Sequence, residues 1–224
     1  MGNSNLNYFK FSWKRLNMSV EPVKVSVIFY SATGNVTALA RQIAASAEKA
    51  GAEVRLRRVT ELAPQAAIDS NPAWAANVAE IASIPEATPE DVDWADAVIV
   101  GSPTRFGNIA SQLKQFLDTL GGLWFQGKLA GKVYSGFASA SGKHGGNEST
   151  LLALYNSFHH FGGIVVAPGY SNEILFANAS PYGVSHWNGS DIDETTLAAA
   201  GAQAERVVET AAALKAGRAA IASA

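Results

Sequence analysis

Cysteine is absent from this sequence, and its absence excludes several kinds of chemistry. A chain without thiols forms no disulfides, binds no iron–sulfur cluster through cysteine and has no cysteine nucleophile. Histidine is scarce too, because the chain has 4 histidines and none stands in an HExxH pattern or in a facing pair. We therefore expect no metal site in this protein.

Charge is nearly balanced, and long apolar runs are missing. The 17 Lys and Arg residues against 19 Asp and Glu residues give a net charge of −2, and the basic residues are scattered. This pattern predicts no nucleic-acid surface. The longest apolar runs reach about seven residues, whereas a membrane-spanning helix needs roughly 18. We expect a cytoplasmic protein with no integral membrane segment.

The sequence does hold enough apolar material for one core. Hydrophobic residues make up 48% of the 224 positions and charged residues 16%, a balance typical of a soluble domain. We divide the chain into an N-terminal arm (1–22), one domain (23–217) and a C-terminal tail (218–224). The arm mixes aromatic and basic residues without the apolar segment of a signal peptide. Two interpretations stay open: an extension upstream of the folded unit, or an arm that packs on a neighbouring surface or subunit.

Strand and helix patterns alternate along the domain. Apolar, β-branched runs predict strands at 23–30, 53–59, 96–101, 132–139 and 164–167. Helical periods predict helices at 36–47, 109–120, 148–161 and 194–215. The last helix is expected to end at Gly217. This alternation indicates an α/β fold with helices on both faces of a five-stranded parallel sheet, in the flavodoxin-like order 2-1-3-4-5.

The segment 60–94 is too long for a plain connection and has four prolines, at 64, 72, 85 and 89. We expect it to pass over the edge of the sheet, with a short helix near 72–83.

Three polar, glycine-containing loops follow strands of this sheet, at 31–36, 102–108 and 139–146. Ligands of such sheets bind beyond the carboxyl ends of the strands, where the strand order reverses. The first loop has short polar side chains, a glycine and a following helix, which suits a phosphate group. It has neither the Lys of a P-loop nor a GxGxxG pattern, so a monophosphate fits it better than a dinucleotide. Ordinary helix capping is the alternative interpretation.

The second and third loops add donors and an aromatic face. In SPTRFGN, Arg105 offers a fork of hydrogen-bond donors and Phe106 a flat apolar ring. The alternative for this loop is a surface turn with Phe106 buried in the core. The third loop, SASGKHGG, has small residues and donors ahead of a helix, and a flexible connection is its alternative.

Taken together, these motifs resemble one family. The similarity is carried by YSATGN after the first strand, GSPTRFGN after the third, TLGGLW (119–124), SASGKHGGNE, His160 and SPYG (180–183). This set is similar to the WrbA-type NAD(P)H:quinone oxidoreductases, which are flavodoxin-like FMN enzymes. The resemblance extends from about residue 23 to 215. Its specific part is PTRFGN followed by GGLW, because TGN alone occurs in many flavodoxins.

The resemblance implies a bound FMN, with NADH or NADPH and quinones as substrates. The FMN phosphate would lie at Ser31, Ala32, Thr33, Gly34, Asn35 and Val36. The second loop would contact the flavin ring, at Thr104, Arg105, Phe106, Gly107 and Asn108. The third loop would border the ribityl chain and the ring, at Ser139, Ala140, Ser141, Gly142, Lys143, His144 and Gly145. The flavin-site and catalytic histidine would be His160, and the quinone pocket would have Phe106 and Trp124 as its walls.

The family is typically tetrameric, and a neighbouring subunit completes the site. We therefore expect a homotetramer or a dimer in which some of these residues serve a partner's flavin. Thr33 departs from the family, where Tyr is usual. The third loop is one residue longer than in the family and has Lys143 and His144 where small neutral residues are usual. A cation beside the flavin would favour its reduced, anionic form, so we expect Lys143 to raise the reduction potential.

The reaction implied is a ping-pong transfer of two electrons from NAD(P)H through the flavin to a quinone. His160 would hydrogen-bond a quinone oxygen and donate a proton, although a satisfied, buried histidine at a helix end is its alternative. A flavodoxin-type electron carrier and an FMN-responsive regulatory protein are the alternative functions.

The second predicted strand has three arginines, Arg55, Arg57 and Arg58. We interpret them first as charges on an edge strand and second as a site for a nucleotide 2′-phosphate. The choice between NADH and NADPH therefore stays open.

Overall fold

The computed structural model describes residues 21–178, 180–188 and 191–223. The predicted N-terminal arm lies outside the described residues, apart from its last two positions.

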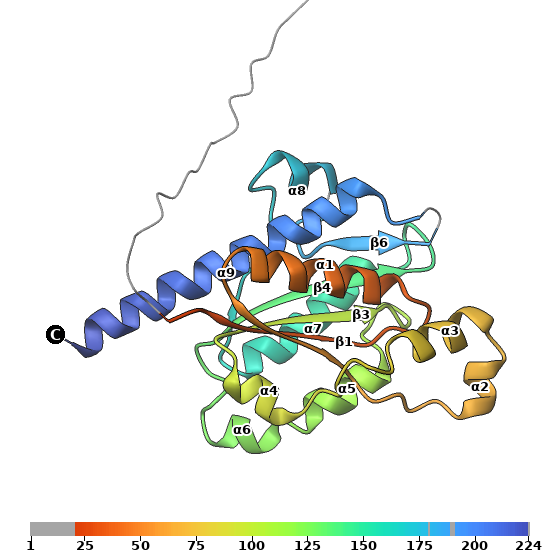
Figure 1. Ribbon diagram of the computed structural model, residues 1–224, viewed down its shortest axis with the longest axis horizontal. Helices are drawn as coiled ribbons and strands as arrows, with labels where there is room; N and C mark the ends of the chain where they lie inside the picture. Colours follow the sequence, from red (N-terminus) through yellow and green to blue (C-terminus); the bar gives the residue numbers. More distant parts are fainter. Residues whose placement is uncertain (1–20, 179, 189–190, 224) are drawn as a thin grey trace, which may run out of the picture.

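A parallel sheet forms the centre of the molecule (Figure 1). The strands are β1 (Lys24–Phe29), β2 (Glu53–Arg58), β3 (Ala97–Pro103), β4 (Val133–Ala140), β5 (Ile164–Val165) and β6 (Ser185–Trp187). They lie in the order β2-β1-β3-β4-β5, and β6 also pairs with β4. Every one of these pairs is parallel. The predicted flavodoxin-like strand order is confirmed.

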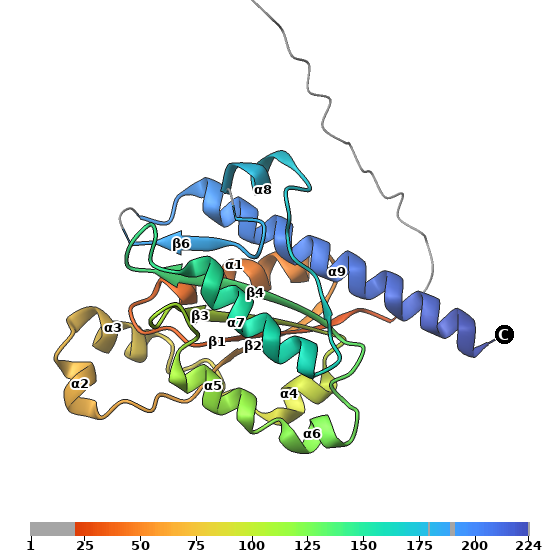
Figure 2. The same ribbon diagram turned by 180° about the vertical axis from the view of Figure 1, so that it is seen from behind.

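The described helices cover both faces of this sheet. Their bounds are α1 (Asn35–Lys49), α2 (Gln65–Asp69), α3 (Pro72–Glu80), α4 (Pro89–Trp94), α5 (Ser111–Asp118), α6 (Gly121–Phe125), α7 (Asn147–His160), α8 (Glu173–Asn178) and α9 (Glu194–Ala222). Figures 1 and 2 show α1, α8 and α9 on one face and α4, α5 and α7 on the other. Two apolar cores result, because side chains alternate along each strand. Val27 of β1 faces the α1 and α9 core, whereas Ile28 faces the α5 and α7 core.

One buried amide attaches α9 to β4 and to the chain that enters β6. Gln203 is fully buried, and its Nε2 donates to Ser135 Oγ at 2.8 Å and to Gly136 O at 2.7 Å. Its Oε1 accepts from Val184 N at 2.7 Å. The backbone polar groups that this amide reaches lie where water does not, so they depend on it for their partners.

The edge strand β2 is covered by the segment 60–94, as the sequence predicts. Arg55 and Arg57 both reach Asp91, at 3.1 and 3.0 Å, and the Asp91 side chain is only 5% exposed. Arg58 pairs with Glu86 at 2.8 Å. These arginines therefore form ion pairs with carboxylates of the same chain, which agrees with their interpretation as edge-strand charges.

Two details differ from the sequence predictions. The prediction that the last helix ends at Gly217 is wrong, because α9 continues to Ala222. An added Cβ at Gly217 would meet nothing within 4 Å. This glycine therefore lies on an open side of the helix, and the helix continues through it. The fifth strand is also shorter than predicted. Ile164 and Val165 pair with the start of β4, and the later part of the same edge, from Ala138, pairs with β6 instead.

No helix in the described ranges is both long enough and apolar enough to cross a bilayer.

Candidate functional site

A cavity of about 260 Å³ opens at the carboxyl ends of β1, β3 and β4. All three predicted loops contribute to it. Its lining consists of Ser31, Ala32, Thr33, Asn35, Val36, Asn71, Pro103, Thr104, Arg105, Ser139, Ala140, Ser141 and Asn188. The lining is rich in hydroxyl and amide groups, and Arg105 supplies its positive charge. The structure thus brings together most of the first loop and parts of the other two.

The first loop is closed by the side chain at its start. Ser31 is buried, and its Oγ accepts from the backbone N–H groups of Gly34 at 3.3 Å and Thr37 at 3.2 Å. Gly34 precedes α1 with a φ of 103°, a conformation that favours glycine. The first turn of α1 therefore begins at the cavity. The leading N–H groups of a helix have no acceptors within it, so this helix end suits an anion.

A buried asparagine from the segment 60–94, which we call the excursion, holds both ends of this loop. Asn77 on α3 is 3% exposed. Its Nδ2 donates to Ser31 O at 2.8 Å, and its Oδ1 accepts from Thr37 Oγ1 at 2.8 Å. One amide thus joins the end of β1 to the first turn of α1. The segment 60–94 is therefore part of the site's support as well as a cover for the sheet edge.

A second polar cluster fixes the excursion beneath the loop, around the carboxylate of Glu61. One Glu61 oxygen accepts from Tyr30 Oη at 2.9 Å and Trp74 Nε1 at 3.0 Å. The other accepts from Gln112 Nε2 at 2.8 Å and from the backbone N–H groups of Leu62 and Ala63, each at 2.9 Å. The carboxylate therefore joins β1, α3 and α5.

Burial and hydrogen bonding set the ionisation of this pair. Burial alone would raise the pKa of Glu61, but hydrogen bonds from the Ala63 backbone, Gln112, Tyr30 and Trp74 outweigh it and lower that pKa below its usual value. Burial, aided by the Glu61 charge, raises the pKa of Tyr30. Tyr30 therefore remains a protonated donor facing an ionised acceptor.

The second loop presents an aromatic ring at its tip. Phe106 has a φ of 53° and is fully exposed, at 107% of its reference area. A bulky residue in the left-handed region is an outlier that needs support from its surroundings. Arg105 N donates to Asn108 O at 2.7 Å, and Asn108 N donates back to Arg105 O at 3.0 Å, which closes the turn around Phe106. The alternative in which Phe106 is buried in the core does not hold.

Close packing of glycines brings the second and third loops together. An added Cβ on Gly146 would lie 3.0 Å from Gly107 Cα, and one on Gly107 would lie 2.9 Å from Ser149 Oγ. Thr104 accepts from Thr150 Oγ1 at 2.8 Å, and its own Oγ1 lies 3.4 Å from Gly145 O.

Some predicted site residues lie outside the cavity lining. In the first loop this is Gly34, in the second Phe106, Gly107 and Asn108, and in the third Gly142, Lys143, His144 and Gly145. Residues 142–145 are exposed beside the opening. Ser139 and Ala140 are buried at its wall, and Ser141 lies at its edge.

His160 and Trp124 lie together, far from the three loops of the same chain. His160 ends α7, which begins at the third loop and spans 14 residues, a length of about 20 Å. Trp124 Nε1 donates to the backbone oxygen of His160 at 2.9 Å, and 55% of the Trp124 side chain is exposed. Both side chains therefore face solvent at the amino-terminal edge of the sheet.

Four residues of the site were not predicted from the sequence. Asn71 and Asn188 line the cavity, Asn77 holds the first loop, and Glu61 fixes the excursion. Asn71 precedes Pro72 and caps α3, accepting from Ala73 and Trp74, a pattern that was readable as a helix start. Asn35 Nδ2 donates to Asn188 Oδ1. Asn188 lies at the cavity because it directly follows β6, which pairs with the carboxyl end of β4.

The fold and the loop cluster define a flavodoxin-like protein with a polar cavity at the switch point of its sheet. The model of the NADPH-dependent FMN reductase family matches residues 23–174. A relative from Deinococcus radiodurans named NAD(P)H dehydrogenase (quinone) is 46% identical over 190 residues, covering 84% of this chain and 95% of the relative. One of the same name from Aromatoleum aromaticum is 41% identical, covering 88% and 100%. The chain therefore belongs to the NADPH-dependent FMN reductase family, together with relatives named NAD(P)H dehydrogenase (quinone).

Solved structures agree with the fold. A flavodoxin, WrbA-like protein from Agrobacterium tumefaciens superposes with a TM-score of 0.61 at 24% identity, covering 85% of this chain and 98% of the other. A flavodoxin from the domain Archaea gives a TM-score of 0.57 at 16% identity, covering 85% and 99%.

The Glu61 cluster makes a prediction about acid stability. Because its folded pKa lies below the usual value, the ionised carboxylate stabilises the folded state fully above the unfolded pKa, near 4.5, and this stabilisation is lost as pH falls through the folded pKa. Glu61→Gln should lower the free energy of unfolding at pH 7 by about 1–2 kcal/mol, and the difference from wild type should shrink below pH 4.5. Urea unfolding between pH 3 and 7 measures it.

Trp74→Phe removes one of the donors and serves as the graded control, with a smaller loss and a weaker pH dependence. A Glu61→Gln difference that is equal at pH 7 and pH 3.5, or that grows in acid, would contradict this account.

Proposed function

We propose that this chain is an FMN-dependent NAD(P)H:quinone oxidoreductase that reduces quinones by two electrons in a ping-pong sequence. The observation that carries the proposal is one cavity lined by the neutral first loop and by Arg105, with the exposed, left-handed Phe106 next to Arg105 in the chain. Family membership and the names of the relatives support it.

The donor set of the first loop fits the FMN phosphate. The loop has Thr33 and Asn35 side chains at the cavity and the beginning of α1 behind them. Helix N–H groups and neutral donors stabilise an anion without a lysine. The hydrogen bonds of Ser31 and Asn77 hold these donors in place without a ligand. This preorganisation lowers the entropy cost of binding.

The second and third loops would border the flavin ring and ribityl chain. Bound FMN would supply the electron-transfer chemistry, and the residues of these loops would supply position and electrostatics. Phe106 offers a flat apolar surface for a planar ring, and Arg105 can stabilise negative charge on an oxygen. Lys143, exposed beside the opening, adds a further cation near the same place, in support of the expected rise in potential.

We further propose that His160 and Trp124 act at the flavin of a neighbouring subunit. Within one chain they lie about a helix length, roughly 20 Å, from the loops. Their side chains are exposed, so a neighbouring subunit could contact them. There Trp124 would bound the quinone pocket beside the partner's second loop, and His160 would donate a proton to the quinone oxygen. A homotetramer or a dimer in the cytoplasm is part of this proposal.

The test of the reaction uses protein purified with its own FMN or reconstituted with added FMN. We expect a yellow protein that oxidises NADH or NADPH only when benzoquinone is present. Double-reciprocal plots at several quinone concentrations should be parallel, because the two substrates use one slot in turn. Intersecting lines would contradict the ping-pong order. Protein that takes up no FMN would contradict the proposal as a whole, and yellow protein without quinone turnover would favour the regulatory alternative.

The shared site predicts complementation between two inactive variants. Gly34→Asp should prevent FMN loading, because the added carboxylate repels the phosphate at a position with positive φ. His160→Ala should retain FMN but lose about 10²-fold in kcat. In co-expressed mixed dimers, one site combines an intact loop with an intact histidine, so equal random mixing should restore about a quarter of wild-type activity.

The matched control is the double variant, with both changes in one chain, co-expressed with the Gly34→Asp chain. This mixture supplies no intact loop and should stay inactive. Tags on the two chains verify that mixed oligomers form. Mixed oligomers of the single variants that show no recovery would contradict a site shared between subunits.

A further inference from the structure

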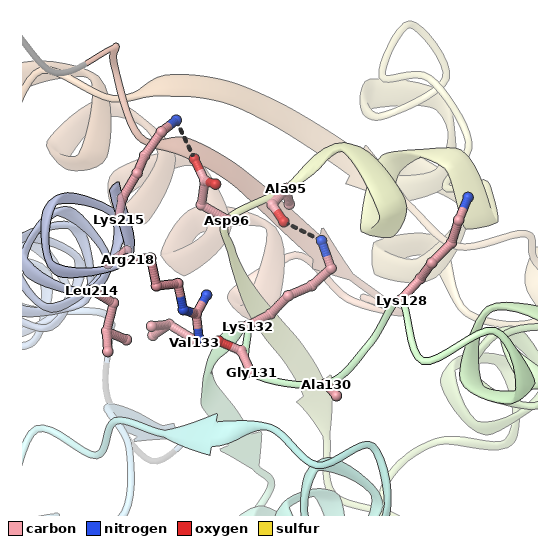
Figure 3. Close-up of a pocket in the computed structure, with 11 residues that line it drawn as sticks. Ala95, Asp96, Lys128, Ala130, Gly131, Lys132, Val133, Leu214, Lys215 and Arg218 are labelled. Carbon is pink, nitrogen blue, oxygen red and sulfur yellow. Dashed lines mark hydrogen bonds and ion pairs between the residues drawn. The ribbon is translucent and has the colours of Figure 1, made fainter. Parts of the chain in front are cut away.

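A second cavity, of about 240 Å³, lies at the opposite edge of the sheet from the flavin loops. Figure 3 shows it between the last turns of α9 and the chain entering β3 and β4. The charged residues in its lining are Lys128, Lys132, Lys215, Arg218 and Asp96. Strand β3 spans 7 residues between the two edges, so the two cavities lie about 20 Å apart.

The carboxylates near this cavity are already engaged. Lys215 pairs with Asp96 at 3.0 Å, and Lys128 pairs with Asp93 at 2.8 Å. Each of these contacts offsets one positive charge with one negative charge. Lys132 and Arg218 therefore remain as the positive charges of the lining that no described ion pair offsets.

The hydrogen bonds of these two cations run to backbone oxygens. Lys132 Nζ donates to Asp93 O at 2.9 Å and Ala95 O at 2.5 Å. Arg218 Nη2 donates to Gly131 O at 2.6 Å. The guanidinium approaches the chain closely there, because a Cβ on Gly131 would lie 2.7 Å from Arg218 Nη2. A guanidinium has five N–H donors, so most of its fork is available to a ligand.

The carboxylates near Lys132 do not fully offset the cost of burying its charge. Desolvation lowers the pKa of Lys132, and the repulsion of Lys128 and Arg218 acts in the same direction against the attraction of Asp93 and Asp96. An anion placed beside the ammonium would favour its charged form.

We propose that this cavity binds a phosphate dianion, which Arg218 would hold through its planar fork and Lys132 would neutralise further as a point charge. Arginine matches phosphate oxygens two at a time, and lysine adds charge without directional demand. The phosphate could belong to free inorganic phosphate or to the 2′-phosphate of a nucleotide, since both present the same dianion. The arginines of β2 are bound to Asp91 and Glu86, which leaves this cavity as the better-placed basic site for such a group.

The test is calorimetric titration of FMN-loaded protein at constant ionic strength, with inorganic phosphate, 2′-AMP and adenosine as separate ligands. Loading with FMN fills the phosphate cradle of the first loop and leaves the second cavity as the site under test. We expect saturable binding of one phosphate per chain. Arg218→Met should weaken it about tenfold or more, and Lys132→Met should do the same. The matched control is Lys114→Met, because Lys114 is an exposed lysine on α5 paired with Asp118.

Tighter binding of 2′-AMP than of phosphate, with none of adenosine, assigns the site to a nucleotide. Equal binding of 2′-AMP and phosphate assigns it to free phosphate. The proposal is overturned if phosphate heats show no saturation, or if Arg218→Met binds as tightly as wild type. Arg218 lies near the exposed end of α9, so this variant remains informative if the buried Lys132→Met fails to fold.

Discussion

The candidate site depends on one buried contact, the amide of Asn77 between the end of β1 and the start of α1. The backbone of Ser31 and the hydroxyl of Thr37 both lie out of water, and this amide satisfies both of them. A buried polar group without a partner costs more than a hydrogen bond gains, so Asn77 stabilises the observed conformation of the loop. The direction of the helix N-terminus toward the cavity follows from that conformation.

The same contact explains why the excursion between β2 and β3 is part of the site. Glu61 and Trp74 fix this segment against Tyr30 and Gln112, and Asn77 projects from it into the first loop. Ionic contacts of Asp91 with the arginines of β2 hold its other end. The segment that covers the sheet edge therefore also holds the first loop in place.

The two edges of the sheet have different chemistry. Neutral donors and one arginine gather at the carboxyl edge, whereas lysines, Arg218 and the exposed Trp124 gather at the amino edge. A single chain holds these groups about 20 Å apart. The proposed reaction, which uses both the loops and His160, therefore requires a second subunit, whose amino edge would lie against the loops of the first.

The sequence was sufficient to predict the strand order and the three loops, because apolar strands and glycine-containing turns leave local patterns. Asn77, Glu61 and Asn188 escaped prediction, because their roles depend on partners 46, 31 and 153 residues away. The end of α9 was missed for a different reason. Gly217 resembles a helix stop, but alanines on both sides support the helix through it. The distance of His160 from the loops follows from the length of α7, which the resemblance alone does not reveal.

The measurement that bears most directly on the central claim is the affinity of the Asn77→Leu apoprotein for FMN, followed by flavin fluorescence. The matched control is Gln65→Leu, which removes an exposed amide from α2 of the same excursion. If the Asn77 amide holds the phosphate cradle, its loss should weaken FMN binding about ten- to a hundredfold, while Gln65→Leu binds as wild type does. Folded Asn77→Leu protein that binds FMN with wild-type affinity would contradict this account.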